Sequence, residues 1–274
     1  FLLENRIDML FAIGGDGTQR GAWEISKELQ RRGAPVAVVG IPKTIDNDIL
    51  FVERTFGVST AIDRARDVLD AAHAEAKSYP NGIALVKLMG RESGFIAAGA
   101  TLASQQVNFV LIPEAPFRLE GETGFLAVLK ERILKRHHAL VVVAEGAGQE
   151  LMPGERGKDV AGNVLNKDIG GFLKESISGY FRQENIPFNL KYIDPSYYIR
   201  SVAADTEDCV LCDLYARHAV HAAMAGKTGI IIGKLSHFVH VPMEMATAAR
   251  QKVRLGSDFW RSVLASTGQP ERMI

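Results

Sequence analysis

The sequence has no net charge, no long apolar run and little cysteine, and each absence argues against a class of protein. Lys and Arg together number 32, as do Asp and Glu, so no basic surplus favours a nucleic acid or an anionic membrane as partner. The longest apolar runs, such as residues 139–144, are far too short to span a bilayer. We expect a cytoplasmic protein without a signal peptide.

The two cysteines, Cys209 and Cys212, form an isolated CxxC within a segment of helical pattern. A metal site needs more ligands, and the nearby His218 and His221 follow helical spacing rather than that of a zinc finger. We therefore interpret the pair as two buried or half-buried thiols in a reducing compartment.

The 274 residues are 47% apolar and 23% charged, as in an ordinary globular protein of one large or two medium domains. Apolar runs of strand length alternate with helical patterns along the whole chain. Strands are predicted at 7–13, 36–41, 83–89, 109–113, 139–144, 189–193, 229–233 and 238–241. Helices are predicted at 20–32, 59–78, 95–105, 122–136, 167–184 and 207–225, with an exposed loop at 150–165. This order predicts an α/β fold with doubly wound, mostly parallel sheets in two lobes and the site between them.

A glycine-rich segment, GGDGT at residues 14–18, follows the first predicted strand and precedes a helix. Glycines let backbone N–H groups approach phosphate oxygens, and a helix N-terminus favours negative charge there. Asp16 within this segment would repel phosphate unless it faces Mg²⁺, so it is a candidate metal-side residue. A tight structural turn is the alternative interpretation.

A second polar segment, PKTIDND, follows the strand at 36–41, which we expect Pro42 to end because proline has no N–H to donate. It therefore lies at the carboxyl end of a strand, where open α/β sheets bind ligands. One of the two carboxylates, Asp46 and Asp48, can act as a base toward a hydroxyl while the other interacts with a metal. Thr44 can donate to a phosphoryl oxygen and Lys43 can neutralise charge, although an Asx-turn would also explain part of the pattern.

GGDGT followed by PKTIDND resembles the phosphofructokinase family, and this pair of motifs is highly specific. The resemblance continues through Met89-Gly90-Arg91, Ile112-Pro113-Glu114, Ala144-Glu145-Gly146, Lys191 to Arg200 and Ala225-Gly226, so it covers essentially the whole chain. The sequence looks most like the ATP-dependent branch found in plants, trypanosomatids and some bacteria.

The resemblance implies Mg²⁺-dependent transfer of a phosphoryl group to the 1-hydroxyl of fructose 6-phosphate. It implies that Asp46 is the general base, that Asp48 and Thr44 lie beside the transferred group and the metal, and that Asp16 is associated with Mg²⁺. It assigns the nucleotide phosphate loop to Gly14, Gly15, Asp16, Gly17 and Thr18. It assigns contacts with the sugar and its 6-phosphate to Met89, Gly90, Arg91, Glu145, Lys191, Tyr197 and Arg200. Without the resemblance, Arg91 and Glu145 could equally be solvated charges at strand ends.

Two positions bear on the phosphoryl donor. Pyrophosphate-dependent relatives usually carry an aspartate where this chain has Gly17, and glycine leaves room for the α-phosphate of a nucleotide. Lys43, in contrast, is typical of the pyrophosphate type. The mixed pair matches the plant-like ATP branch, so we predict ATP as donor, with pyrophosphate as the alternative.

The resemblance implies that the chain begins after an amino-terminal βα segment that the family normally has. We expect a donor lobe at 1–57 and 199–249 that lacks its amino-terminal part, and a sugar-phosphate lobe at 58–198 and 250–274. The resemblance also implies a homo-oligomer, a tetramer or a dimer. A non-catalytic sugar-phosphate-binding subunit or an inert fragment stays open as an alternative, whereas another GGDGT kinase is disfavoured by TIDND.

Overall fold

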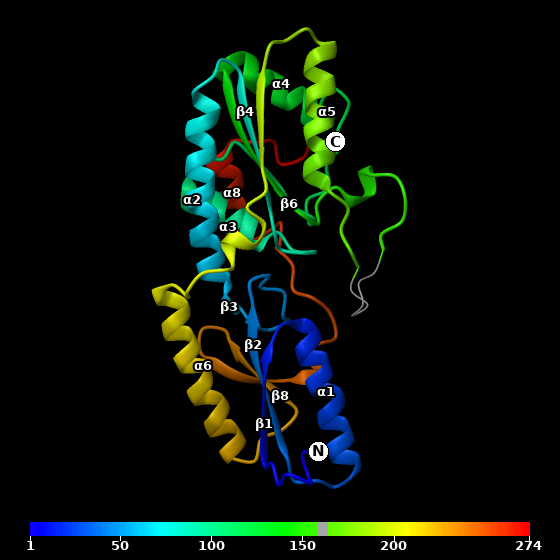
Figure 1. Cartoon of the computed structure of the whole chain (residues 1–274), viewed down its shortest axis with the longest axis vertical. Coiled ribbons are helices and arrows are strands. Elements are labelled where there is room, and N and C mark those ends of the chain that lie inside the picture. Colours follow the sequence, from blue (N-terminus) through cyan, green and yellow to red (C-terminus); the bar gives the residue numbers. More distant parts are fainter. Residues whose placement is uncertain (158–163) are drawn as a thin grey trace. The chain divides into compact units, whose positions relative to one another are not determined.

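The computed structural model describes residues 1–157 and 164–274, and the chain divides into two compact units (Figure 1). The first unit comprises Phe1–Thr60 and Ala203–Gln251, and the second comprises Ala61–Val202 and Lys252–Ile274. Each unit has its own sheet. Of the loop predicted at 150–165, residues 158–163 lie outside the described part of the chain.

The first unit is built on a sheet in the order β1-β2-β8-β9, with β3 paired to the end of β2. Its strands are β1 (Met9–Gly14), β2 (Ala37–Thr44), β3 (Phe56–Gly57), β8 (Ile230–Lys234) and β9 (Phe238–Pro242). Its helices are α1 (Asp16–Arg31), α6 (Thr206–Met224) and α7 (Met243–Ala246). All pairings are parallel except that of β8 with β9.

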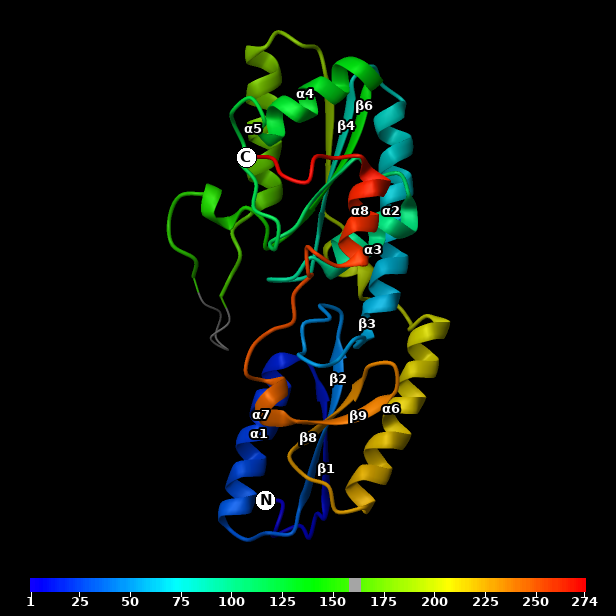
Figure 2. The same cartoon turned by 180° about the vertical axis from the view of Figure 1, so that it is seen from behind.

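Both faces of this sheet are covered by a helix. Val38 and Val39 in β2 are fully buried and point to opposite faces because strand side chains alternate. Val38 belongs to the core with Ala22 and Leu29 of α1, whereas Val39 belongs to the core with Tyr215 of α6. Figure 2 shows α1 and α6 on opposite sides of these strands. A strand buried on both faces explains the continuous apolar run in the sequence.

The second unit has an entirely parallel sheet in the order β5-β6-β4-β7. Its strands are β4 (Gly82–Leu88), β5 (Phe109–Leu111), β6 (His138–Ala144) and β7 (Asn189–Ile193). Its helices are α3 (Phe95–Ser104), α4 (Phe125–Arg136), α5 (Ile169–Gln183), α8 (Asp258–Thr267) and most of α2 (Val58–Lys77). Helix α2 lies on one side of the sheet and α5 on the other (Figures 1 and 2). The prediction of an α/β fold with parallel sheets is confirmed.

Hydrogen bonds fix the starts of α2 and α6 within the first unit. The Asp205 side chain caps α6 by accepting from the backbone N–H of Asp208 at 2.7 Å. The buried Asp208 carboxylate accepts from the N–H and the hydroxyl of Thr60, at 2.9 and 2.6 Å. These contacts satisfy N–H groups that the first turns of the two helices leave without intrahelical partners.

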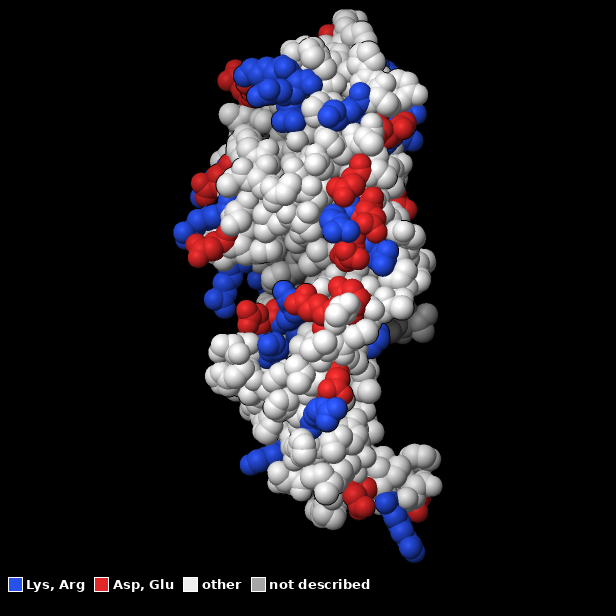
Figure 3. Space-filling view, turned by 90° about the vertical axis from the view of Figure 1, so that its left-hand side faces the viewer, with Lys and Arg blue, Asp and Glu red and all other residues white. Residues whose placement is uncertain are grey.

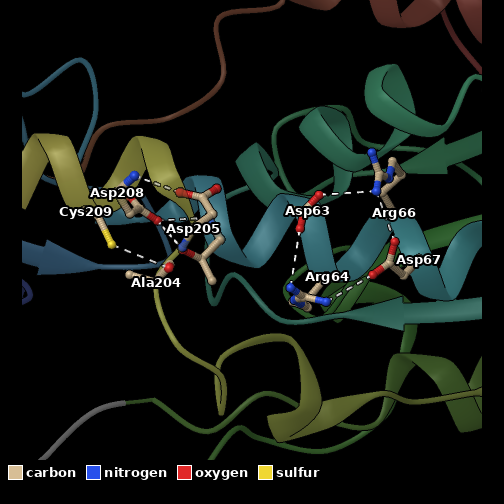
Figure 4. Close-up of polar contacts among 9 residues, drawn as sticks. Asp63, Arg64, Arg66, Asp67, Ala204, Asp205, Asp208 and Cys209 are labelled. Atoms are coloured by element: carbon tan, nitrogen blue, oxygen red, sulfur yellow. Dashed lines mark hydrogen bonds and ion pairs between the residues drawn. The ribbon is translucent and has the colours of Figure 1, made fainter.

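Exposed charges of both signs are interspersed on the face shown in Figure 3. On α2, for example, Arg64 pairs with Asp67 at 3.3 Å and Arg66 pairs with Asp63 at 3.3 Å (Figure 4). Among the described residues, no helix combines the length and apolar character needed to cross a bilayer.

Three local predictions are wrong. Strand β2 does not end before Pro42 but runs to Thr44, because β3 pairs with Lys43 and Thr44. Helix α1 begins at Asp16 rather than near residue 20, so three of the five residues of the glycine-rich segment lie in its first turn. The two cysteine thiols are exposed, because each follows a buried residue of α6 and points about 100° around the helix from it.

Candidate active site

The two motifs of the first unit meet at the carboxyl edge of its sheet. Strands β1 and β2 are parallel, and Gly14 at the end of β1 is in register with Pro42 of β2. A Cβ atom added to Gly15 would lie 3.4 Å from the Cβ of Thr44. The glycine-rich turn and the TIDND loop are therefore neighbours, as strand-end positions in a parallel sheet predict.

Gly14 and Gly17 of the glycine-rich segment differ in how much space the surrounding atoms leave for a side chain. A Cβ on Gly14 would lie 2.3 Å from the hydroxyl oxygen of Thr18, so packing alone demands glycine there. A Cβ on Gly17 would meet no atom of the described residues within 4 Å, although Gly17 lies in the first turn of α1. Packing within the chain thus gives no reason for glycine at position 17, and open space beside the helix N-terminus suits a phosphate-bearing ligand.

An arginine that no motif indicated joins the two loops. The Arg250 guanidinium lies 3.2 Å from Oδ2 of Asp16 and 3.6 Å from Oδ2 of Asp48. The Asp16 side chain is 12% exposed and that of Asp48 is 5% exposed. Arg20 pairs with the other oxygen of Asp16 at 3.0 Å from the solvent side. Two largely buried carboxylates are therefore held together by a shared cation.

This carboxylate pair fits Mg²⁺ of the kind that phosphotransferases use. The described ranges contain no group of three or more His, Cys, Asp and Glu side chains that could enclose a metal ion. Mg²⁺ in such enzymes is usually held by one or two carboxylates together with substrate phosphates. Asp16 and Asp48 are two such carboxylates, but Arg20 and Arg250 contact both oxygens of Asp16 and one of Asp48, so Mg²⁺ would need these contacts to change and a phosphate ligand to complete the site.

Asn47 shapes the loop that carries the two aspartates. It adopts a φ of 53°, and its buried side chain accepts from the N–H of Thr55 at 2.8 Å and donates to the carbonyl of Glu53 at 3.0 Å. Asp46, half-buried, follows Thr44 and donates its N–H to the Thr44 hydroxyl at 3.1 Å. Asparagine tolerates left-handed backbone better than most residues, which explains its place between the two carboxylates.

The Gln19 side chain forms hydrogen bonds with both β1 and β2. Its side chain is fully buried in α1, and its amide nitrogen lies 2.9 Å from the carbonyl oxygen of Gly14 and 3.1 Å from that of Ile41. Carbonyls at the ends of both strands thereby gain a donor. The sequence motifs did not indicate Gln19, because a polar residue in the first turns of a helix normally faces solvent.

In the second unit, two predicted sugar-binding segments also meet at a sheet edge. Met89, Gly90 and Arg91 follow β4, and Glu145 follows β6, with Leu88 in register with Ala144. The Glu145 carboxylate accepts from the backbone N–H of Arg91 at 2.6 Å. Gly90 has a φ of 145°, a conformation that only glycine adopts readily.

Tyr197 lies in a short turn, Ser196–Ile199, after the neighbouring strand β7, and Arg200 directly follows this turn. The Arg200 guanidinium carbon lies 4.5 Å from the centre of the Tyr197 ring, and both side chains are exposed. Three adjacent strands, β6, β4 and β7, thus contribute predicted substrate residues at their carboxyl ends. Stacking orients the guanidinium while its edge remains available to an anion.

The structure does not place Lys191 beside these predicted substrate residues. It lies within β7 in register with Ala84, and its ammonium is 3.9 Å from Glu75 and 5.4 Å from the centre of the Tyr79 ring. Leu88 lies four positions further along β4, about 13 Å away at the usual rise of a strand. Proximity to Tyr197 in the sequence suggested a shared site, but the strand register separates them.

Comparison with known proteins agrees with these motifs. A family model described as Phosphofructokinase matches residues 1–223. The chain is 50% identical to the ATP-dependent 6-phosphofructokinase of Borreliella burgdorferi and 43% identical to that of Trypanosoma brucei brucei, covering 97% and 94% of this chain. It spans 62% and 53% of the length of those two relatives.

Solved structures show the same fold. The pyrophosphate-dependent phosphofructokinase of Marinobacter aquaeolei matches with a TM-score of 0.75 at 21% identity, over 97% of this chain and 69% of that one. The phosphofructokinase of Pichia pastoris matches with a TM-score of 0.71 at 22% identity, over 97% of this chain and 27% of that one. By its family match, its paired motifs and its fold, the chain belongs to the phosphofructokinase family.

Proposed function

We propose that this chain carries the catalytic site of an ATP-dependent 6-phosphofructokinase, which transfers the γ-phosphoryl group of ATP to the 1-hydroxyl of fructose 6-phosphate. The products are ADP and fructose 1,6-bisphosphate. The observation that carries the proposal is the meeting of the glycine-rich turn and the TIDND loop, where Arg250 joins Asp16 and Asp48. Relatives named for this activity support it.

In this proposal the first unit binds the donor and holds the base. Backbone N–H groups at the start of α1 face the donor phosphates, and Asp16 and Asp48 would hold Mg²⁺, which neutralises charge on those phosphates. Asp46 accepts the proton of the sugar 1-hydroxyl while the oxygen of that hydroxyl attacks the γ-phosphorus, and ADP leaves. Thr44 donates to a phosphoryl oxygen, and Lys43 stabilises the charge that develops during transfer.

The second unit binds the sugar phosphate. Arg200, already oriented by Tyr197, suits the 6-phosphate because a guanidinium binds phosphate oxygens in a forked geometry. Glu145 accepts sugar hydroxyls, since a carboxylate has more acceptor positions than its bond to Arg91 uses. The segment Met89-Gly90-Arg91 lines the same edge. Lys191 is left out of this site because the register places it elsewhere.

ATP is the donor in this proposal because of the open space at Gly17. Lys43, exposed at the end of β2, is the feature that favours pyrophosphate instead. Full-length enzyme with Mg²⁺ is expected to use ATP with a far higher kcat/KM than pyrophosphate. Initial rates with each donor at saturating fructose 6-phosphate test this, and equal or faster turnover with pyrophosphate would reverse the donor assignment.

A further inference from the structure

A cluster of charged residues connects three elements of the second unit. The ammonium of Lys87, near the end of β4, lies 2.8 Å from Oδ2 of Asp194, which directly follows β7. It also lies 3.4 Å from Oδ1 of Asp168, the residue before α5. The hydroxyl of Tyr192 in β7 lies 3.5 Å from the same Asp168 oxygen. Lys87 and Asp168 lie outside the motifs that indicate the family, whereas Tyr192 and Asp194 lie within the segment Lys191 to Arg200.

The Lys87 ammonium is withdrawn from solvent and depends on these carboxylates. Its side chain is only 21% exposed, whereas Asp168 is 62% and Asp194 is 32% exposed. Burial lowers the pKa of Lys87, but the hydrogen bond with Asp194 and the nearby Asp168 charge outweigh burial and raise it overall. The raised pKa favours the charged form of the lysine, and a partly buried cation keeps its carboxylate partner in place.

Asp194 transmits this contact to the predicted sugar-binding turn. One carboxylate oxygen of Asp194 binds Lys87, and the other accepts from the backbone N–H of Ser196 at 2.9 Å. Ser196 begins the turn that carries Tyr197 and leads to Arg200. Both oxygens of one side chain thus connect β4 to the segment that presents these two exposed residues.

We propose that Lys87 is a positioning residue for sugar-phosphate binding, which fixes Asp194 so that the turn presents Tyr197 and Arg200 in one orientation. The inference rests on the proposed function of the second unit. Lys87 itself does not contact the sugar phosphate; it lowers the cost of ordering the turn when the sugar phosphate binds.

The kinetic test compares two lysine substitutions in the full-length enzyme. Lys87→Met is expected to raise the KM for fructose 6-phosphate about tenfold, with kcat and the KM for ATP changed less than about twofold, as for lost preorganisation of one substrate. Lys87→Arg, which keeps the charge, is expected to recover most of the affinity. The matched control is Lys130→Met, which removes a 3.2 Å ion pair with Glu184 in the same unit. The control is expected to leave all three parameters unchanged.

A second measurement does not depend on activity. Amide hydrogen exchange of residues 194–201 in the ligand-free protein is expected to be faster in Lys87→Met than in wild type or Lys130→Met. Asp194→Asn, which leaves Lys87 in place, is expected to accelerate exchange in the same segment and to decide the matter if Lys87→Met does not fold.

The possible outcomes separate the two proposals. If the wild type is active and Lys87→Met has the same KM for fructose 6-phosphate and the same amide hydrogen exchange as Lys130→Met, the proposed role of Lys87 is wrong. A wild type that does not turn over fructose 6-phosphate overturns the proposed function, and exchange alone then judges the link from Lys87 to the turn.

Discussion

The guanidinium of Arg250 lies 3.2 Å from a carboxylate oxygen of Asp16, although 234 residues separate the two in the sequence. Arg250 is also held in place by the chain around it. The next residue, Gln251, donates its backbone N–H to the carbonyl of Asp48 at 2.8 Å, and Arg250 itself forms a β-bridge with Ile49. The backbone around Arg250 therefore pairs with the loop that carries Asp46 and Asp48, and the Arg250 side chain pairs with Asp16 of the glycine-rich segment.

Arg250→Met is expected to destabilise the protein and to impair donor binding. It leaves two largely buried carboxylates without their shared cation, and the loss of charged hydrogen bonds costs about 2 kcal/mol of unfolding free energy. The control is Arg20→Met, which removes the ion pair between the mainly exposed Arg20 and the same Asp16 and should cost less than about 0.5 kcal/mol. Urea denaturation of both variants measures the difference; equal stabilities would show that Arg250 does not hold the carboxylates together.

Acid is expected to destabilise the second unit through two neighbouring histidines, His73 and His138, whose ring centres are 5.5 Å apart. Burial lowers the pKa of both, so the unfolded chain binds more protons than the folded chain in mildly acidic solution. The stability they support is complete above the unfolded pKa of about 6.5 and declines as the pH falls below it.

The unfolding free energy of wild type and of the double variant His73→Asn, His138→Asn, measured at several pH values between 5 and 8, tests this. The variant should show a shallower loss of stability below about pH 6.5. Parallel curves would show that these two histidines do not contribute to the acid sensitivity.

Local patterns predicted the elements of the fold because periodicity and strand-end turns are properties of neighbouring residues. The alternation of strands and helices indicated parallel sheets, and the ends of β1 and β2 met as predicted. Features that depend on pairing between distant segments could not be read in this way. Strand β3 has two residues and no pattern, and the register that separates Lys191 from Glu145 is set by β7 pairing with β4.

The polar residues that sequence reasoning missed share one property. Each of them contacts a partner on another element of the fold: Arg250 contacts Asp16, Gln19 contacts Ile41 and Lys87 contacts Asp194. In the sequence, each has the pattern of an ordinary loop, helix or strand residue. The motif residues of the first unit, in contrast, lie in two short continuous segments, residues 14–18 and 42–48. The domain boundaries, the oligomeric state, the compartment and the roles of the site residues stay predictions.

Asp46→Asn is expected to remove the base while keeping the size of the side chain. In the full-length enzyme kcat should fall by about 10²–10⁴, the usual contribution of a general base, with the KM for fructose 6-phosphate little changed. Asn47→Ala provides the contrast, because it removes buried hydrogen bonds with Glu53 and Thr55 and should cost about 1–3 kcal/mol of stability. A wild-type kcat in Asp46→Asn would remove Asp46 from the mechanism.

Gly17→Asp tests whether position 17 selects the donor without supporting the fold. Within residues 1–157 and 164–274, a Cβ there meets no atom within 4 Å, so the variant should unfold at nearly the wild-type denaturant concentration. Its carboxylate would face the donor phosphates at the start of α1, and like-charge repulsion should lower kcat/KM for ATP by at least about tenfold. Gly14→Ala is the opposite case, since its Cβ would lie 2.3 Å from the Thr18 hydroxyl oxygen and stability should fall. If Gly17→Asp keeps the wild-type kcat/KM for ATP, the space beside α1 is not where the nucleotide phosphates bind, and the donor assignment loses its structural support.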